Sequence, residues 1–135
     1  MKKVLIIDGQ GGKIGSAMIE QLKALRPEQE LIAIGTNSIA TAAMLKAGAH
    51  FGATGENPVV SGCRDADIIV GPLGILAADA LIGEITPAMA VAIGQSHAQK
   101  ILLPVNKCNH FVVGLSDKPF GELIHLAVKH ILSIL

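Results

Sequence analysis

Short apolar runs divide the chain at regular intervals and predict buried strands. Each run is almost continuous in apolar residues, which is typical of parallel strands covered on both faces; the runs are 4–7, 31–34, 67–70 and 101–105. A weaker run at 49–53 is interpreted as a further strand, and the apolar residues 111–115 as another. The pattern therefore predicts a mostly parallel sheet of five or six strands.

Between these runs the spacing of apolar residues changes to that of helices. Residues 14–25 carry apolar side chains three or four positions apart, and Pro27 ends this predicted helix. A second helix is predicted at 39–47, with either Asn37 or Ser38 as its N-cap. More helices are predicted further along the chain, one ending near residue 65, one at 88–93 and one at 119–135.

Strands that alternate with helices form β-α-β units, because a parallel strand needs a crossover to return to the same edge. The chain of 135 residues is long enough for one such domain with its own core and too short for two. We therefore expect a single three-layer, doubly wound (Rossmann-like) α/β domain. In this architecture a ligand lies beyond the carboxyl ends of the strands where the strand order reverses, here between the first and fourth strands.

The first strand leads through Asp8 into a glycine cluster at the start of the first helix. Glycine lets the backbone turn sharply and approach a ligand, and the helix directs free N–H groups and the positive end of its dipole toward that ligand. The cluster of Gly9, Gly11, Gly12 and Gly15 therefore predicts a site for a phosphate or another anion. The alternative is a tight strand-to-helix turn that binds nothing.

The spacing of these glycines limits which phosphate sites the turn resembles. A dinucleotide turn has the pattern G-x-G-x-x-G, whereas this chain has G-x-G-x-x-x-G, because Ile14 precedes the last glycine. A P-loop would need a glycine in place of Ile7 and a hydroxyl in place of Ile14, so this class is excluded. No triphosphate chemistry of that type is expected.

Small polar residues at the end of the second strand extend the predicted site. A site for NAD would carry Asp or Glu here to bind the ribose hydroxyls, but this chain has Thr36, Asn37 and Ser38. Three such groups at a helix start suit a 2′-phosphate, so NADP is favoured over NAD if the ligand is a dinucleotide. The alternative is that Asn37 or Ser38 merely caps the helix.

Loops after the first, second, fourth and fifth strands supply the predicted binding residues, because these loops meet at one edge of a parallel sheet. The expected ligand is a small phosphorylated molecule, either a nucleotide such as NADP or a phosphorylated metabolite. The predicted binding residues are Gly9, Gln10, Gly11, Gly12, Lys13, Ile14, Gly15, Thr36, Asn37, Ser38, Gly71, Pro72 and Asn106.

The overall composition excludes some partners. The formal net charge is +0, and the chain has no Trp, no Tyr and few Phe, so it lacks both the basic field and the stacking platform of a nucleic-acid-binding protein. The first apolar run is too short for a signal peptide. Because Cys63 and Cys108 lack the C-x-x-C spacing of a metal or redox site, we expect reduced thiols and a cytoplasmic protein.

The apolar stretch at 71–94 resembles a membrane span in composition only. Asp79, Glu84 and the Thr86-Pro87 pair interrupt it and predict two short helices, the second capped by Thr86, so no membrane partner is expected. The second helix is apolar almost all round, and the closing helix has only one narrow polar stripe. We therefore expect a homo-oligomer, a dimer or larger; a core position within one chain is the alternative for the second helix.

No residue pattern identifies a reaction. Asp8 and Glu56 are candidates for a general acid and base, but Asp8 has the alternative role of hydrogen-bonding the turn. Cys108 lies beside Lys107 and His110, although neighbours in sequence need not converge, and an activated thiol is not expected. The histidines show no metal-ligand spacing, and no metal site is expected. A binding module, a small enzyme such as an oxidoreductase and an assembly subunit without an active site are the hypotheses.

Blocks of sequence along nearly the whole chain carry a resemblance to a known family. The blocks are IDGQGGKIG, GTNSIATAAMLKAGA, GATGENPVV, DIIVGPLGIL and GEITPAMAVAIGQSHAQKILLPVNKCN. They resemble a small bacterial family known only as a domain of unknown function, which implies no activity. The first two blocks also resemble nicotinamide-dinucleotide-binding domains, which implies a Rossmann-type fold and a cofactor of that class.

Overall fold

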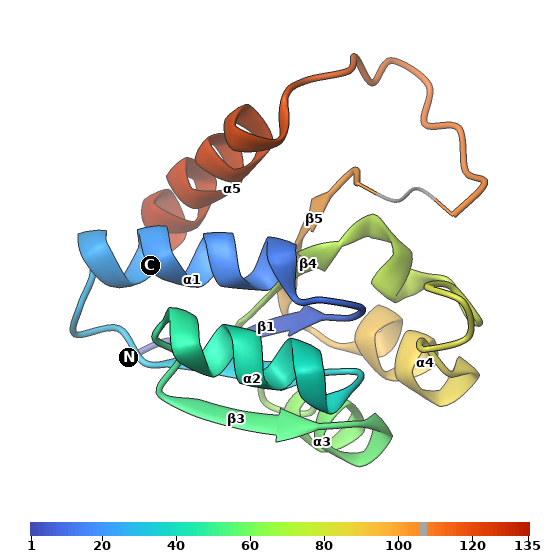
Figure 1. Cartoon of the computed structure of the whole chain (residues 1–135), viewed down its shortest axis with the longest axis horizontal. Coiled ribbons are helices and arrows are strands. Elements are labelled where there is room, and N and C mark those ends of the chain that lie inside the picture. Colours follow the sequence, from blue (N-terminus) through green and yellow to red (C-terminus); the bar gives the residue numbers. More distant parts are fainter. Residues whose placement is uncertain (106–107) are drawn as a thin grey trace.

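The computed structural model describes residues 1–105 and 108–135, which contain one five-stranded sheet. Its strands are β1 (Val4–Asp8), β2 (Leu31–Gly35), β3 (Phe51–Thr54), β4 (Ile68–Pro72) and β5 (Gln99–Leu103). Their order is β3-β2-β1-β4-β5, and each neighbouring pair is parallel. The predicted doubly wound architecture is confirmed, and the strand order reverses between β1 and β4 (Figure 1).

Helices cover both faces of the sheet and complete the three layers. They are α1 (Lys13–Leu25), α2 (Ser38–Ala47), α3 (Glu56–Gly62), the short 3-10 helix η1 (Leu73–Leu76), α4 (Pro87–Gln95) and α5 (Phe120–Ile134). The helices α1, α2 and α5 pack on one face, and α3, η1 and α4 pack on the other (Figure 1). The carboxyl ends of β1, β2 and β4 therefore meet at one edge of the sheet, which is the edge where ligands of doubly wound folds bind.

The central strand β1 shows why its apolar run is continuous. Val4 and Ile6 pack under α1 and α5, while Leu5 and Ile7 pack against α3 and α4, and all four side chains are fully buried. Because successive side chains of a strand point to opposite faces, a strand with two covered faces needs an apolar residue at every position. The strand therefore anchors the turn that follows it to both layers of helices.

The predicted strand at 111–115 is wrong. This segment is an irregular loop, and Phe111 and Val113 are 89% and 87% exposed. The backbone before and within it is left-handed, at Cys108 (φ 52), Asn109 (φ 63) and Gly114 (φ 83), which interrupts an extended conformation. Among the described residues the sheet pairs only β1 to β5, and residues 110–113 line a shallow pocket with Leu73, Leu76 and Ala77 instead. The apolar composition of this loop was the only signal for a strand.

The ends of the other elements agree with the caps in the sequence. Asn37, rather than Ser38, is the N-cap of α2, since its side-chain oxygen accepts a hydrogen bond from the Ala40 amide at 2.8 Å. The Thr86 hydroxyl caps α4 in the same way, accepting from the Met89 amide at 3.2 Å. Shifts of a few residues occur elsewhere; α3 ends at Gly62 rather than near residue 65, and β5 begins at Gln99 rather than at 101.

The helix α4 is covered within the chain on one side only. Met89, Ala90 and Ile93 are buried against α3 and η1, whereas Val91 is 54% exposed. The core position named as the alternative for this helix is therefore correct for its inner face. In the described part of the chain, none of these helices has both the length and the apolar character of a membrane span.

Candidate functional site

The glycine turn between β1 and α1 is held by its own backbone. Gln10 and Gly12 adopt left-handed conformations, with φ of 49° and 73°, and the Gly12 amide donates to the Gly9 carbonyl at 2.9 Å. A methyl group on Gly12 would lie 2.9 Å from the Ala40 carbonyl oxygen of α2, whereas one on Gly11 would meet nothing within 4 Å. Gly12 therefore serves the fold, and Gly11 borders open space.

Gly15 serves packing as well. A side chain at this position would meet Met44 on α2, with its Cβ 2.4 Å from the sulfur, and Asp8 at 3.2 Å. The absence of a side chain at Gly15 thus allows α1 to lie closely against α2 and β1. The close packing against α2 therefore explains Gly12 and Gly15. It does not explain Gly9 and Gly11, which are the positions where a ligand or another segment of the chain can approach the turn.

Asp8 fastens the turn to the start of α1. Its carboxylate, which is only 4% exposed, accepts from the Gly9 amide and from the Gly15 amide, each at 2.8 Å. Burial raises the pKa of Asp8; the hydrogen bonds from Gly15, Gly9 and Ile14 oppose this effect, and the charge of Glu84 adds to it. Asp8 thus has the turn-holding role, which was the alternative to a catalytic one.

A cleft lies beside the turn, beyond the carboxyl ends of β1 and β4. Its volume is about 240 Å³, and its lining residues are Asp8, Gly9, Gln10, Gly11, Lys13, Ile14, Pro72, Leu81, Val105 and Phe120. The amides of Gly11 and Lys13 have no hydrogen-bond acceptor among the residues that the structure describes. These two donors, one in the turn and one on the first residue of α1, are therefore available to a ligand in the cleft.

Lys13 and Phe120 connect the two helices that border the cleft. The Lys13 ammonium lies 4.6 Å from the centre of the Phe120 ring, a cation–π contact between the first residue of α1 and the first residue of α5. Lys13 is exposed and Phe120 is half-buried. The contact holds a positive charge at the edge of the cleft, close to the two open amides.

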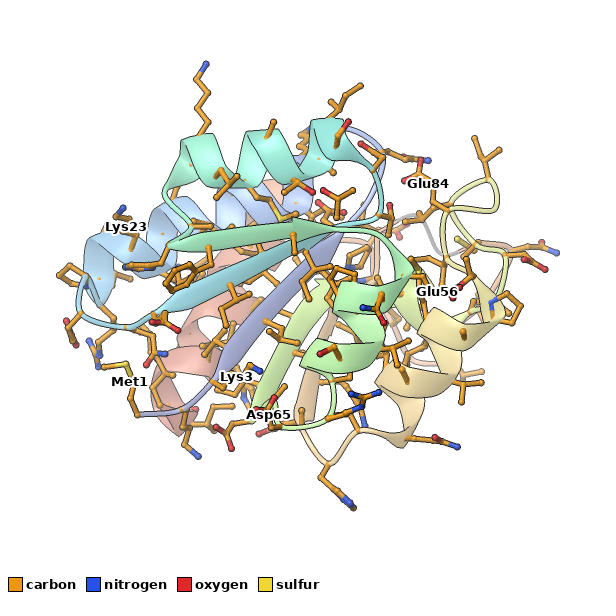
Figure 2. The ribbon with its side chains drawn as sticks, turned by 90° about the horizontal axis from the view of Figure 1, so that it is seen from below. Met1, Lys3, Lys23, Glu56, Asp65 and Glu84 are labelled. Carbon is orange, nitrogen blue, oxygen red and sulfur yellow. The ribbon has the colours of Figure 1, made fainter. Side chains whose placement is uncertain are left out.

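The predicted binding residues omit Leu81, Val105 and Phe120 of the cleft lining, and they omit Glu84, which contacts the turn beside the cleft. One of the Glu84 carboxylate oxygens, Oε1, accepts from the Gln10 amide at 2.8 Å, the Thr36 hydroxyl at 2.5 Å and the Asn37 side-chain amide at 2.9 Å. Burial alone would raise the pKa of Glu84, but the hydrogen bonds from Thr36, Gln10 and Asn37 outweigh it and lower the pKa. Figure 2 shows Glu84 near the carboxyl ends of the strands.

This contact changes the environment of the polar residues after β2. Thr36 and Asn37 direct their donors at Glu84, and Asn37 also caps α2, while Ser38 is exposed. A 2′-phosphate placed at this point would therefore meet a carboxylate. No local signal identifies Glu84, because 48 residues separate it from Thr36 in the sequence.

The structure brings some of the remaining candidates into the cleft and leaves others outside. Pro72 lines the cleft, but Gly71 is buried under it, where a side chain would lie 2.4 Å from the Ile7 carbonyl oxygen. Glu56 accepts from the Thr86 hydroxyl at 2.5 Å and does not line the cleft. Asn106 and Lys107 lie outside the described residues. Across residues 1–105 and 108–135, no three His, Cys, Asp or Glu side chains are grouped as metal ligands.

Comparison with known proteins assigns a family without an activity. Residues 3–135 match a family described as a domain of unknown function, DUF3842. The chain belongs to that family. The predicted resemblance to a domain of unknown function is thus confirmed, and it covers nearly the whole chain. A search of curated proteins finds no match. Among solved structures, a dodecameric FMN-dependent UbiX-like decarboxylase from Escherichia coli O157:H7 is similar, with 14% identity, coverage of 97% of this chain and 93% of that chain, and a TM-score of 0.46.

Proposed function

We propose that the protein binds a small phosphorylated molecule, of mononucleotide size or less, with a phosphate at the glycine turn. The observation that carries this proposal is the pair of amides at Gly11 and Lys13, which have no acceptor among the described residues and border a cleft of about 240 Å³. The Lys13 amide lies in the first turn of α1, where the helix dipole favours an anion, and the Gly11 amide lies in the turn just before the N-cap Gly12. The Lys13 ammonium adds a positive charge at the same edge.

The position of the cleft supports the same proposal. It lies at the carboxyl end of β1, next to β4, where the order of the strands reverses. In open parallel sheets this crevice is the usual ligand site, because the loops on either side of it diverge. The apolar side chains of Leu81, Val105 and Phe120 on its walls suit the uncharged part of such a ligand.

The size of the cleft and the charge of Glu84 narrow the class of ligand. Pockets for drug-sized molecules measure about 300–1,000 Å³, and this cleft is smaller, which favours a ligand smaller than a dinucleotide. Glu84 holds the donors of Thr36 and Asn37, which a 2′-phosphate of NADP would need. The proposal therefore favours a mononucleotide or a sugar phosphate over NADP.

The substitution Gly11→Ala tests this proposal without disturbing the fold. The added methyl has open space and a permitted backbone conformation, so the variant should keep the stability of the wild type. The same methyl projects beside the amide that would bind the phosphate, and affinity should fall about tenfold or more. Titration calorimetry with AMP, ribose 5-phosphate and inorganic phosphate measures the change.

Gly94→Ala is the matched control for Gly11→Ala. Gly94 also has open space around its Cβ position, but it lies on α4, away from the cleft. The control variant should bind each probe as the wild type does. Equal affinities of wild type and Gly11→Ala for every phosphorylated probe would contradict the proposed function.

A further inference from the structure

The segment between η1 and α4, residues 77–84, folds back over the glycine turn. A methyl group on Gly9 would lie 2.8 Å from Glu84 Oε1 and 2.8 Å from Leu81 Cδ1. Leu81 is buried at that place and lines the cleft, whereas Ile82 at the tip is 96% exposed. The segment therefore covers the side of the turn that faces β2 through Glu84, and through Leu81 it borders the cleft that lies toward β4.

The backbone of this segment is strained. Asp79, Leu81 and Ile82 have φ of 66°, 57° and 56°, and Gly83 follows with φ of 83°. A left-handed conformation is costly for residues with a Cβ, most of all for a β-branched residue such as Ile82. Such a conformation persists only where the surroundings impose it. The free energy that holds the segment in this shape therefore has to come from its contacts.

Those contacts separate into an internal set and an external set. Inside the segment, the Gly83 amide donates to the Asp79 carbonyl at 3.0 Å and the Glu84 amide donates to the Leu81 carbonyl at 3.2 Å. Toward the turn, Glu84 receives the hydrogen bonds from Gln10, Thr36 and Asn37, and Leu81 packs on Gly9. The segment is thus a folded unit, and the carboxylate supplies its polar attachment to the site.

We propose that residues 77–84 form a lid over the glycine turn, which Glu84 latches closed by occupying the place of an anionic oxygen of the ligand. The proposal rests on the proposed function, because the lid covers the same turn. A hydroxyl, a side-chain amide and a backbone amide all converge on the single oxygen Oε1. Three donors at this range suit a charged oxygen, and a phosphate oxygen has the same requirement.

The arrangement of the amides specifies the ligand that opens the latch. The Gln10 amide is bound to Glu84, and the next amide along the chain, that of Gly11, is open. Neighbouring amides suit two linked phosphates, so a diphosphate group should use both and displace the Glu84 carboxylate. A single phosphate should use the open amides and leave the latch closed.

The test compares pyrophosphate with orthophosphate in calorimetric titrations of wild type, Glu84→Ala and Glu84→Gln. A latch multiplies the apparent affinity by the fraction of molecules that are open, so if about a tenth or less of the wild type is open, Glu84→Ala should bind pyrophosphate about tenfold tighter or more. Glu84→Gln removes the charge and keeps the shape, and it should show a smaller gain in the same direction. Orthophosphate should bind all three proteins equally.

Glu56→Gln is the control for the loss of one negative charge near the site. Glu56 contacts Thr86 at the start of α4 and does not touch the turn. This control should bind pyrophosphate as the wild type does. Equal or weaker binding of pyrophosphate by Glu84→Ala would overturn the latch, because Glu84 would then be inert or a direct ligand contact.

Amide hydrogen exchange of residues 79–85 gives a readout that needs no ligand. The exchange should be faster in Glu84→Ala than in the wild type, and pyrophosphate should accelerate it in the wild type. Unchanged exchange in the variant would overturn the lid. Faster exchange in the variant, with no phosphate bound by any protein, would support the lid and overturn the proposed function.

Discussion

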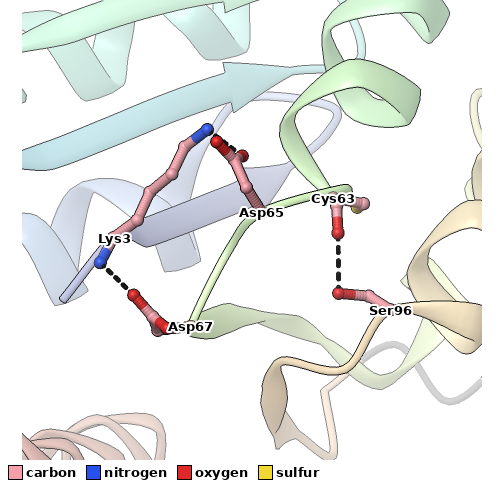
Figure 3. A network of polar contacts seen from close by, with 5 residues as sticks. All are labelled: Lys3, Cys63, Asp65, Asp67 and Ser96. Carbon is pink, nitrogen blue, oxygen red and sulfur yellow. Dashed lines mark hydrogen bonds and ion pairs between the residues drawn. The ribbon is translucent and has the colours of Figure 1, made fainter.

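The two ends of the sheet hold their carboxylates in different ways. At the amino end the Lys3 ammonium pairs with Asp65, and the Lys3 amide donates to Asp67 at 2.7 Å (Figure 3). At the carboxyl end Asp8 and Glu84 accept from backbone amides, a hydroxyl and a side-chain amide. In the described residues neither of these two carboxylates lies within ion-pair distance of a cation.

This difference indicates that the contacts at the amino end are structural, whereas the donors at the carboxyl end suit the proposed replacement of Glu84 by an anion. The amino-end contacts connect β1 to the segment between α3 and β4, and Ser96 adds a hydrogen bond to the Cys63 carbonyl at 2.9 Å (Figure 3). Their ion pair is exposed, and exposed pairs contribute little to stability. At the carboxyl end neutral donors are directed at one point, so an external anion can replace Glu84 without leaving a cation unpaired.

The largest expected effect on stability is that of Asp8→Ala. This change leaves the amides of Gly9 and Gly15 without an acceptor in a buried place, at a cost of about 1–3 kcal/mol for each unsatisfied group. Urea denaturation at neutral pH measures the loss. Asp67→Ala is the control, since Asp67 also accepts a backbone hydrogen bond but is exposed, and water can replace it. Equal losses of unfolding free energy in the two variants would contradict the difference between the carboxyl end and the amino end of the sheet.

A smaller effect is expected in the pH dependence of Glu84. Its folded-state pKa is lowered, so the stabilisation from its ionised form is present above the ordinary value of 4.5 and is lost as the pH falls through the lowered pKa. The stability advantage of wild type over Glu84→Gln should therefore shrink as the pH decreases below 4.5. Urea midpoints at a series of pH values give this difference. An advantage that grows on acidification would contradict the assigned hydrogen bonds.

The smallest effect is expected for Asp65→Asn. The Lys3 hydrogen bond and charge lower the pKa of Asp65, but the carboxylate is fully exposed and its pair is screened by solvent. The Tm of the variant should be close to that of the wild type at low salt and at high salt, as measured by thermal unfolding. A loss of stability comparable to that of Asp8→Ala would show that the exposed ion pair at the amino end contributes as much to stability as the buried hydrogen bonds of Asp8.

The sequence determines the fold further than it determines the site. Continuous apolar runs such as 4–7 require two covered faces, which predicts the parallel sheet, and the general rule for doubly wound sheets predicts that the strand order reverses between the first and fourth strands. Caps such as Asn37 and Thr86 act over three residues, so their roles are readable locally. The glycine turn was predicted for the same reason.

Contacts over long sequence distances were not predictable in this way. Glu84 contacts Gln10, which is 74 positions away in the sequence. The path of the backbone that brings Glu84 there depends on left-handed residues such as Ile82, which no local pattern favours. The loop around Phe111 is predicted as a strand because a short apolar run has no periodicity that distinguishes a strand from other structure, and nothing local shows that these side chains are exposed. The homo-oligomer stays a prediction; exposed apolar residues such as Val91, Phe111 and Val113 mark where a contact would form.

The central position of β1 has a consequence for the order in which the protein is built. The first strand to be synthesised pairs with β2 on one side, but its other edge stays unpaired until residues 68–72 have been added. A chain that ends after α2 therefore contains every glycine of the turn, yet it lacks the wall of the cleft at Pro72 and the carboxylate of Glu84. Since domains begin to fold as they emerge, the glycine residues are synthesised early, but the cleft beside them is complete only after the later segments have been added.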